Sequence, residues 1–212
     1  MNRLCVVIKM FLLTVTVFCV SCGRGKITEY SAEMAHSGPN YKSPHVAKLF
    51  VVPQKIRVEN PMPDNLGPGI VIIREDKGIM QMIMSKKNTY FEIPMTKKNN
   101  FGQLGRIPDD AKVKELGVET INGYKCKKKR VETIAKSMSR SKIVKSTVWI
   151  SDLFDIPIKT EYEDGRIMEL RNIKPGRQSE ELFKMSSKCK KSSFPIFKSS
   201  SRAHSPVRSS TP

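Results

Sequence analysis

The sequence predicts a mainly β protein for three reasons. Short stretches in which apolar and polar residues alternate recur along most of the chain, as in half-buried strands. Two dipeptides that favour tight hairpin turns, Asn122-Gly123 and Asp164-Gly165, separate some of these stretches. No long stretch repeats apolar residues at helical spacing. Many short strands joined by hairpins favour an antiparallel sheet, either closed into a barrel or curved over other parts of the chain.

Eleven strands are expected, each from a period-two pattern or from a compact β-branched run. They cover residues 28–35, 47–52, 55–59, 70–74, 78–85, 89–93, 118–121, 124–134, 142–151, 156–163 and 166–174. Asp164-Gly165, between the last two, favours a type I′ turn. Two stretches do not fit a strand: residues 61–68 form a turn-rich loop, and residues 99–114 form a loop with at most a short helix near 109–116.

The first 21 residues have the features of a cleavable bacterial export signal. A short basic start is followed by residues 10–20, which are apolar and uncharged but too few to cross a bilayer as a helix. Small Ser21 then precedes Cys22, which resembles the lipobox of lipoproteins, although Cys19 stands where a lipobox usually has Leu. We expect the Cys22 thiol to carry a lipid that anchors the chain. Ordinary cleavage near Ser21 is the alternative, and both imply export.

Positive charge is concentrated at the two ends of the chain. The formal net charge is +18, from 38 basic and 20 acidic residues. Residues 1–26 and 186–212 together hold ten of the basic side chains and no acidic one, so the middle of the chain is only moderately basic. Residues 186–212 are also rich in serine and poor in apolar residues, which predicts a disordered tail.

The run of residues 125–130 is the most basic part of the middle of the chain. A nucleic-acid site would place stacking aromatic side chains beside it, and only Tyr124 is near. Strand alternation would also divide these charges between two faces. We therefore expect a solvated edge strand, with an anionic membrane surface as the second interpretation and no nucleic-acid partner. Within this run, Cys126 could pair with Cys189 or remain a free thiol, and both alternatives are open.

No arrangement of residues typical of catalysis or metal binding is present in the sequence. The histidines His36, His45 and His204 lack the spacings that place two imidazoles on one metal ion. The glycine patterns of phosphate-binding loops and of serine hydrolases are absent as well. We therefore expect a protein that is not an enzyme and that has no catalytic residue, metal site or cofactor.

Three stretches resemble, in their order and spacing, a family of exported bacterial proteins that is similar to the LolA/LolB lipoprotein-carrier superfamily. They are a strand pair with a two-lysine turn (77–93), an Asn-Gly-Tyr-Lys-Cys hairpin (117–130) and an Asp-Gly hairpin that ends in Leu-Phe (149–183). The resemblance covers about residues 27–185. It implies a single antiparallel sheet curved into an unclosed half-barrel, apolar on its concave side. Residues 61–68 and 99–116 are the candidate lids, as loops or short helices.

The expected organisation is a signal peptide (1–21), a lipidated linker (22–26), a β domain (27–185) and the tail (186–212). We expect a cell-envelope lipoprotein that binds lipid, acyl chains or lipoprotein. Met80, Met82, Met84 and Trp149 are the candidate ligand-binding residues, because flexible Met side chains suit variable acyl chains. Each of them also fits an ordinary sheet core.

The alternative is a structural or protein-interaction module of the envelope without a small ligand. In either case the sequence leaves the oligomeric state open. The residue after Cys22 is Gly23 and not the Asp that retains lipoproteins in an inner membrane. We therefore expect a periplasm-facing protein anchored to the outer membrane.

Overall fold

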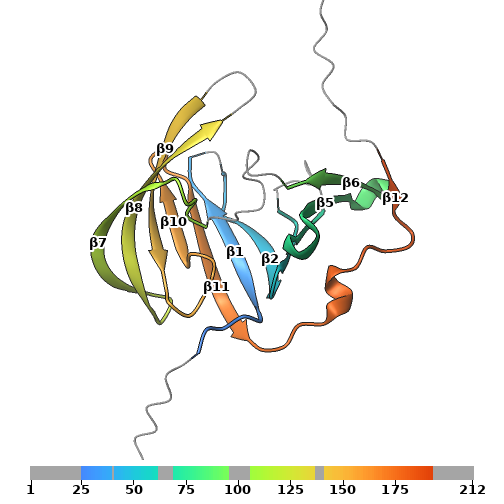
Figure 1. The fold of residues 1–212 in the computed structure, drawn as a ribbon, viewed down its shortest axis with the longest axis horizontal. Coiled ribbons are helices and arrows are strands. Elements are labelled where there is room, and N and C mark those ends of the chain that lie inside the picture. Colours follow the sequence, from blue (N-terminus) through green and yellow to red (C-terminus); the bar gives the residue numbers. More distant parts are fainter. Residues whose placement is uncertain (1–24, 40, 62–68, 96–105, 137–140, 193–212) are drawn as a thin grey trace, which may run out of the picture.

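The computed structural model describes residues 25–39, 41–61, 69–95, 106–136 and 141–192 of the 212-residue chain. Within these ranges, twelve strands form one sheet (Figure 1). The strands are β1 (Tyr30–Ser37), β2 (His45–Val52), β3 (Lys55–Glu59), β4 (Ile70–Arg74), β5 (Ile79–Met84), β6 (Thr89–Pro94), β7 (Lys112–Ile121), β8 (Tyr124–Lys136), β9 (Ser141–Ile150), β10 (Lys159–Tyr162), β11 (Ile167–Pro175) and β12 (Lys190–Lys191). Short 3-10 helices are η2 (Glu75–Lys77), η3 (Ser85–Lys87) and η5 (Glu180–Phe183). The predicted mainly β fold is confirmed.

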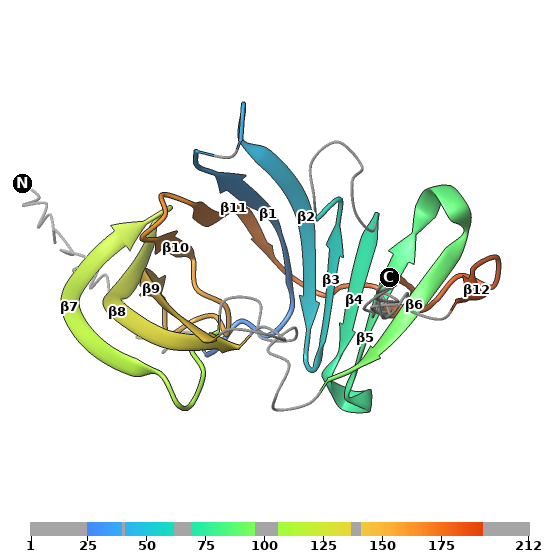
Figure 2. The same ribbon diagram turned by 90° about the horizontal axis from the view of Figure 1, so that it is seen from above.

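The sheet is open, with β7 at one edge and β12 at the other. Its strand order is β12-β6-β5-β4-β3-β2-β1-β11-β10-β9-β8-β7. Figure 2 shows that the sheet bends along this order without its two edges meeting. Neighbouring strands are antiparallel except β12 and β6, which are parallel because residues 176–189 first carry the chain across the sheet. The predicted curved, unclosed sheet is confirmed, and the parallel pair at one edge is the difference from a purely antiparallel one.

Cross-strand register divides strands β1–β6 into two faces, because directly opposed residues point the same way. One row across six strands joins Tyr30, Val51, Ile56, Ile73, Met80 and Ile93. The next row on this face joins Ala32, Leu49, Val58, Val71, Met82 and Phe91. We call this side the Tyr30 face. Its residues from β1–β3 are buried and make up much of the main hydrophobic core.

The opposite side of β2–β5, which we call the Ile72 face, has a smaller core of its own. Its buried residues are Val52, Ile72 and Ile83. Phe183 of η5 packs against them and is only 1% exposed. The Arg57 guanidinium also donates a hydrogen bond of 2.8 Å to the Leu182 carbonyl oxygen. Residues 180–183 therefore add a second layer to this half of the sheet.

The expected short helix near residues 109–116 is wrong, because β7 already begins at residue 112 and pairs with β8 along its length. The register shifts at Leu116, which forms a β-bulge. Because of this extra residue, Val113 and Val118 lie on the same face although they are five positions apart. The bulge thus breaks the alternation by which a strand is recognised in sequence. Of the two candidate lids (61–68 and 99–116), residues 62–68 and 99–105 lie outside the described residues.

The two predicted hairpin turns differ in type. Asn122 and Gly123 both have positive φ, 49° and 81°, as a type I′ turn requires. At the other hairpin only Gly165 has positive φ, 82°, and its N–H donates a 3.0 Å hydrogen bond to the Tyr162 carbonyl. This is a three-residue loop with a bulge glycine and not the expected type I′ turn. A Cβ on Gly38 would lie 2.7 Å from the Gly165 carbonyl oxygen, so the end of β1 touches this loop.

The chain keeps contact with the sheet beyond residue 186, where the tail was expected to begin. The backbone N–H groups of Lys190 and Ser192 donate hydrogen bonds of 2.9 Å to the carbonyls of Asn88 and Tyr90. The expected signal peptide, Cys22 and residues 193–212 lie outside the described residues. In the ranges that the structure describes, no helix is long and apolar enough to cross a membrane.

Candidate functional site

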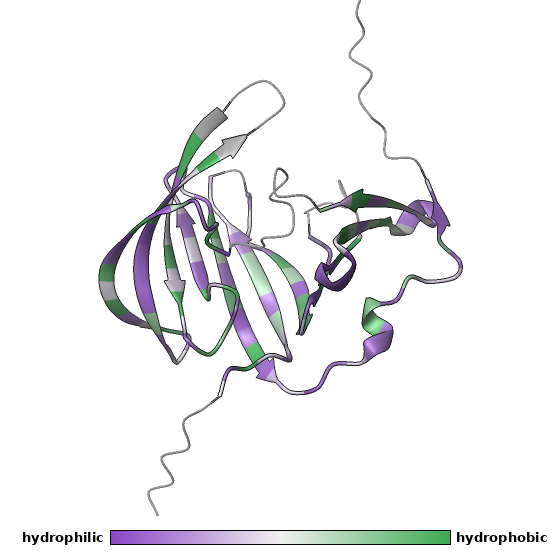
Figure 3. Ribbon diagram, viewed as in Figure 1, coloured by the Kyte–Doolittle hydropathy of each residue, from purple (hydrophilic) through white to green (hydrophobic). Residues whose placement is uncertain are grey.

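Met80, Met82 and Met84 all lie on the Tyr30 face of β5, because they are two residues apart in one strand. Met80 is buried in the main core, whereas Met82 and Met84 are half-buried. Side chains from β4 and β6 on the same face are half-buried as well. Together they form an apolar strip, here called the Met82 strip: Val71, Met82, Met84, Phe91 and Ile93. Figure 3 shows the hydrophobic colouring of these outer strands.

Trp149 does not join this strip. The register places it in one row with Lys128, Lys159, Glu169 and Ala35, on the side of the sheet opposite the Tyr30 face. Its Nε1 donates a hydrogen bond of 2.8 Å to Glu119, and its side chain is 3% exposed. The ammonium groups of Lys128 and Lys159 lie 5.1 and 4.9 Å from its ring centroid. Trp149 is thus a buried packing residue of the main core with a polar partner, and it points to the face opposite the one that carries the methionines.

A cavity of about 550 Å³ lies at the end of the sheet where β1 begins and where β2 and β9 end. Tyr30 and Val51, which line it, belong to the same cross-strand row as Met80. The loop before β7 contributes Arg106 and Ile107 to the lining. The cavity therefore continues the Tyr30 face at one end of the Met80 row. Its volume is within the range of about 300–1,000 Å³ that is usual for small-ligand sites.

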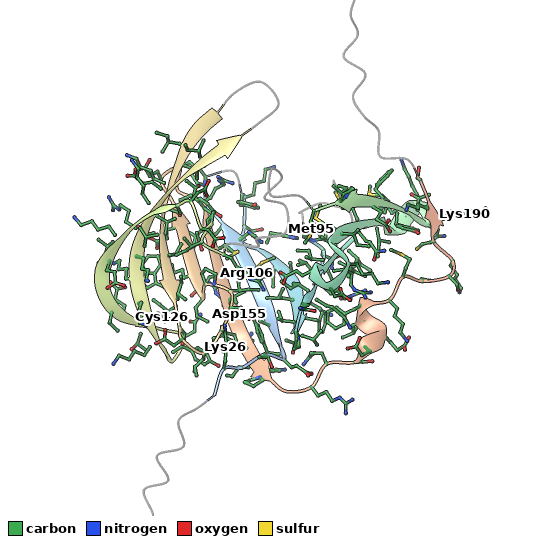
Figure 4. The ribbon with its side chains drawn as sticks, viewed as in Figure 1. Lys26, Met95, Arg106, Cys126, Asp155 and Lys190 are labelled. Atoms are coloured by element: carbon green, nitrogen blue, oxygen red, sulfur yellow. The ribbon has the colours of Figure 1, made fainter. Side chains whose placement is uncertain are left out.

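Two ion pairs flank this cavity. Arg106 Nη1 lies 2.5 Å from a Glu75 carboxylate oxygen, and the Lys26 ammonium contacts the Asp155 carboxylate. Figure 4 shows Arg106, Asp155 and Lys26 in succession beside β1. Within each pair the charges neutralise one another, so the mouth carries polar groups but little net charge.

The Tyr30 hydroxyl is the unsatisfied polar group of the cavity. It is buried and has no hydrogen-bond partner among the described residues. Burial raises the pKa of this hydroxyl, and the nearby Asp155 carboxylate raises it further. Tyr30 is protonated at neutral pH, as a tyrosine normally is, and its hydroxyl is a donor that no described residue uses.

Sequence reasoning did not find Tyr30, Arg106 or Glu75 as residues of one site. Tyr30 stands in an ordinary strand pattern, and Arg106 lies in a glycine-containing loop with no nearby motif. Glu75 and Arg106 are 31 residues apart and meet only because the loop before β7 crosses the end of β4. No local sequence pattern predicts the contact between Glu75 and Arg106.

Two further buried polar atoms lie on the Tyr30 face. Thr160 Oγ1 and His36 Nε2 have no hydrogen-bond partner among the described residues. They belong to one cross-strand row with Met168 between them. Burial lowers the pKa of His36, and the neighbouring His45 lowers it further. Met168 separates the two atoms, so they do not form a joint site.

The basic run of residues 125–130 is divided between the two faces, as strand alternation predicts. Three of its lysines are in ion pairs: Lys127 with Asp152 at 2.8 Å, Lys128 with Glu119 at 2.6 Å and Lys129 with Glu115 at 3.3 Å. The expected edge strand is wrong: the run lies on β8, which pairs with β9 on one side and with the edge strand β7 on the other. Its cations therefore do not form one continuous patch.

Cys126 and Cys189 are both free thiols. Cys126 is buried on β8, and Cys189 directly precedes β12 at the other edge of the sheet, which Figure 4 shows by its labels for Cys126 and Lys190. Burial raises the pKa of the Cys126 thiol and makes it a poor nucleophile. Among the described residues, no three His, Cys, Asp or Glu side chains gather as metal ligands would.

Comparison with solved structures finds similar chains at low sequence identity. An uncharacterised conserved protein from Thermus thermophilus is 12% identical over 79% of this chain and 91% of its own, with a TM-score of 0.51. A chain of the Pseudomonas aeruginosa MucA/MucB complex is 10% identical over 76% of this chain, with a TM-score of 0.49, and this chain covers 57% of its length. A Vibrio parahaemolyticus domain described as an outer membrane lipoprotein-sorting protein is 13% identical over 73% and 88%, with a TM-score of 0.36. The likeness to the Thermus protein shows a shared fold.

No protein with curated annotation matches the chain significantly by sequence. A family of conserved domains does match, over residues 31–156, which is more than half of the chain. The matched segment runs from β1 to the loop after β9 and thus includes the Met82 strip and most of the cavity lining. The chain therefore belongs to the family described as Domain of unknown function (DUF4412).

Proposed function

We propose that the protein is a non-enzymatic binding protein of the cell envelope that holds an acyl chain of a lipid or lipoprotein on the Tyr30 face. The observation that carries the proposal is the continuity between the half-buried Met82 strip and the cavity at Tyr30. Both lie on one face and are joined through the row that contains Met80. Sites for small apolar ligands combine an apolar lining with a few polar groups that fix orientation.

The side chains of this surface suit such a ligand. Met82 and Met84 are unbranched and polarisable, so they adapt to acyl chains of different length and saturation. The Tyr30 hydroxyl can donate to an ester or amide carbonyl at the head of the chain. At the mouth of the cavity the two cations are already paired with carboxylates. Binding of a neutral acyl group is therefore favoured over binding of a free anion.

The N-terminal part of the proposal concerns attachment to the membrane. Residues 1–21 are removed on export, Cys22 carries the lipid, and residues 22–26 link it to a β domain of residues 27–185. With Gly23 after the lipidated residue, the protein faces the periplasm from the outer membrane. Mass spectrometry of the N-terminus from membranes tests this part. A triacylated Cys22 is the expected result, and a free N-terminus beyond residue 22 would refute the anchor.

Ligand binding is tested on protein isolated from the envelope of the producing cell. Organic extraction and mass spectrometry should identify acyl compounds bound in addition to any lipid attached at Cys22. In Met82→Gln, a substitution of similar length in the strip, the bound amount should fall severalfold. In Val118→Gln, on exposed β7 and outside the strip, it should be unchanged.

Thermal unfolding of both variants checks that the fold is retained. Equal amounts of ligand in Met82→Gln and wild type would contradict binding on the strip. If wild-type protein carries no acyl compound and takes up no fluorescent fatty-acyl probe, the binding proposal is wrong and an envelope interaction module becomes the better explanation.

A further inference from the structure

The end of the β8–β9 hairpin exposes a pair of isoleucines. Ile134 is 57% exposed and Ile143 is 61% exposed, the two highest values among the large apolar side chains that the structure describes. They are direct cross-strand partners, so they lie side by side on one face. The hairpin projects past the neighbouring strands (Figure 1). Single exposed apolar residues are common, but two adjacent ones at a projecting end form a small continuous apolar surface.

Cations without partners lie on the same face of this hairpin. Lys114 of β7 stands directly opposite Arg130 of β8, and Arg130 is four residues from Ile134 and therefore points the same way. Neither Lys114 nor Arg130 forms an ion pair with a carboxylate that the structure describes. Lys112, on the same face, stands directly opposite Glu132, whose carboxylate also lies 3.8 Å from the Lys145 ammonium. Directly opposed like charges destabilise a strand pair. An anion bound between them would relieve this repulsion.

We infer that this surface, the Ile134 patch (Ile134, Ile143, Lys112, Lys114 and Arg130), docks on an anionic phospholipid membrane. The isoleucines would enter the boundary between headgroups and acyl chains, and the cations would contact lipid phosphates. The patch consists of few residues, whereas a stable protein interface takes about 20–30 on each side. Nucleic acid is disfavoured because Trp149, the nearest aromatic residue of these strands, is buried and unavailable for stacking.

This inference does not depend on the ligand proposed for the Tyr30 face. The end of the β8–β9 hairpin, which carries Ile134 and Ile143, lies at the opposite end of the molecule from Lys26, where the described chain begins to enter the fold (Figure 4). A lipid on Cys22 would therefore hold the other end of the sheet at its membrane. The patch would meet a second membrane surface and would not reinforce the first attachment.

The test uses a chain that starts at Gly23, which lacks the apolar segment 10–20 and keeps every described contact, since these begin at residue 25 or later. The probe is sedimentation with vesicles of phosphatidylcholine alone and of equal parts phosphatidylcholine and phosphatidylglycerol. We expect binding to the mixed vesicles only, and release of the protein at high salt.

Paired variants locate the contact. Lys114→Gln with Arg130→Gln should weaken binding about thirtyfold, because each cation near such a surface contributes about 1 kcal/mol. Ile134→Asn with Ile143→Asn should weaken it about tenfold through lost apolar burial. The matched controls are Lys125→Gln, an exposed cation on the opposite face of β8, and Val118→Asn, which is 56% exposed on the opposite face of β7. Neither control should change binding.

Three results would overturn the inference. The first is binding that does not depend on phosphatidylglycerol, and the second is an equal loss of binding in the control variants. The third is retention of the chain by soluble polyanions without binding to vesicles, which would indicate an acidic macromolecule as the partner. Circular dichroism of each variant verifies the fold, and changes at such exposed positions usually alter stability by less than about 0.5 kcal/mol.

Discussion

Strands β1–β5 and strand β7 belong to one sheet, yet they are stabilised in different ways. In β2, β4 and β5 both faces carry buried side chains, one set in the main core and the other under Phe183. In β7 every residue except Ile121 is exposed, and the strand is held by its hydrogen bonds to β8 and by ion pairs such as Lys129–Glu115. A long strand can thus extend a sheet without a core of its own, and its side chains remain available for other contacts.

The largest expected effect is the loss of the layer over the Ile72 face. Phe183→Ala should lower the free energy of unfolding by about 3–5 kcal/mol, because it removes a fully buried aromatic side chain and leaves a cavity. Urea denaturation measures the loss. Amide hydrogen exchange should accelerate at Lys190 and Ser192, whose N–H groups bond to the carbonyls of Asn88, just before β6, and of Tyr90 in β6. Met185→Ala, half-buried in the same segment, is the control and should cost clearly less.

A direct pair of substitutions compares the two regions. Leu49→Ala in buried β2 should cost about 2–5 kcal/mol, whereas Val118→Ala in exposed β7 should change stability by less than about 0.5 kcal/mol. Urea denaturation of both variants gives the comparison. Similar losses for the two would show that β7 is packed against a surface and would contradict its description as a strand without a core.

Trp149 lies between the two regions and should have an intermediate effect. Trp149→Phe removes the hydrogen bond to Glu119 and weakens the contacts with Lys128 and Lys159, at a cost of about 1–2 kcal/mol. A double-mutant cycle with Glu119→Ala, which removes the acceptor of the Trp149 Nε1–H bond, checks the cause. The loss of unfolding free energy in the double variant should be smaller than the sum of the two single losses. If the losses are strictly additive, the hydrogen bond contributes nothing.

The smallest effect concerns pH. The folded protein holds the pKa of His36 below 6.5, while the unfolded chain has the ordinary value, so the unfolded chain binds more protons as the pH falls below about 6.5. The contribution of His36 is complete above that pH and is lost as the pH falls toward its folded pKa. Unfolding at a series of pH values should show this slope in wild type and a shallower one in His36→Gln. An NMR titration that gives His36 a pKa above 6.5 would reverse the sign.

Much of the fold could be predicted from the sequence because strand alternation is a local signal. Strands β1–β6 and β8–β11 follow period-two patterns or compact β-branched runs. Met80, Met82 and Met84 share a face because they are two residues apart in one strand. The bulge at Leu116 removed the signal for the first half of β7. The Asp164-Gly165 dipeptide is compatible with several loop types, so it does not determine which one forms. The structure adopts the three-residue loop, which Gly38 approaches closely.

The candidate site was predictable only in part. Its apolar strip follows from the methionine spacing. The separation of Trp149 from the methionines depends on the register of the eight strands from β9 to β5 in the sheet, which no local pattern determines. The cavity is formed by segments distant in sequence, such as Arg106 and Glu75. Contacts between residues so far apart in the chain are created by the fold, and no local sequence pattern predicts them.

The place where the chain enters the sheet also determines how the domain resists tension. The Ile27 N–H donates a hydrogen bond of 2.8 Å to the Leu153 carbonyl, and β1 follows directly, paired with β2 on one side and β11 on the other. A pull on the N-terminus therefore shears two ladders of hydrogen bonds at once and does not peel an edge strand bond by bond. A pull on the C-terminal end would instead load the two-residue strand β12 at the edge. A domain tethered by its N-terminus is thus held at its mechanically stronger end.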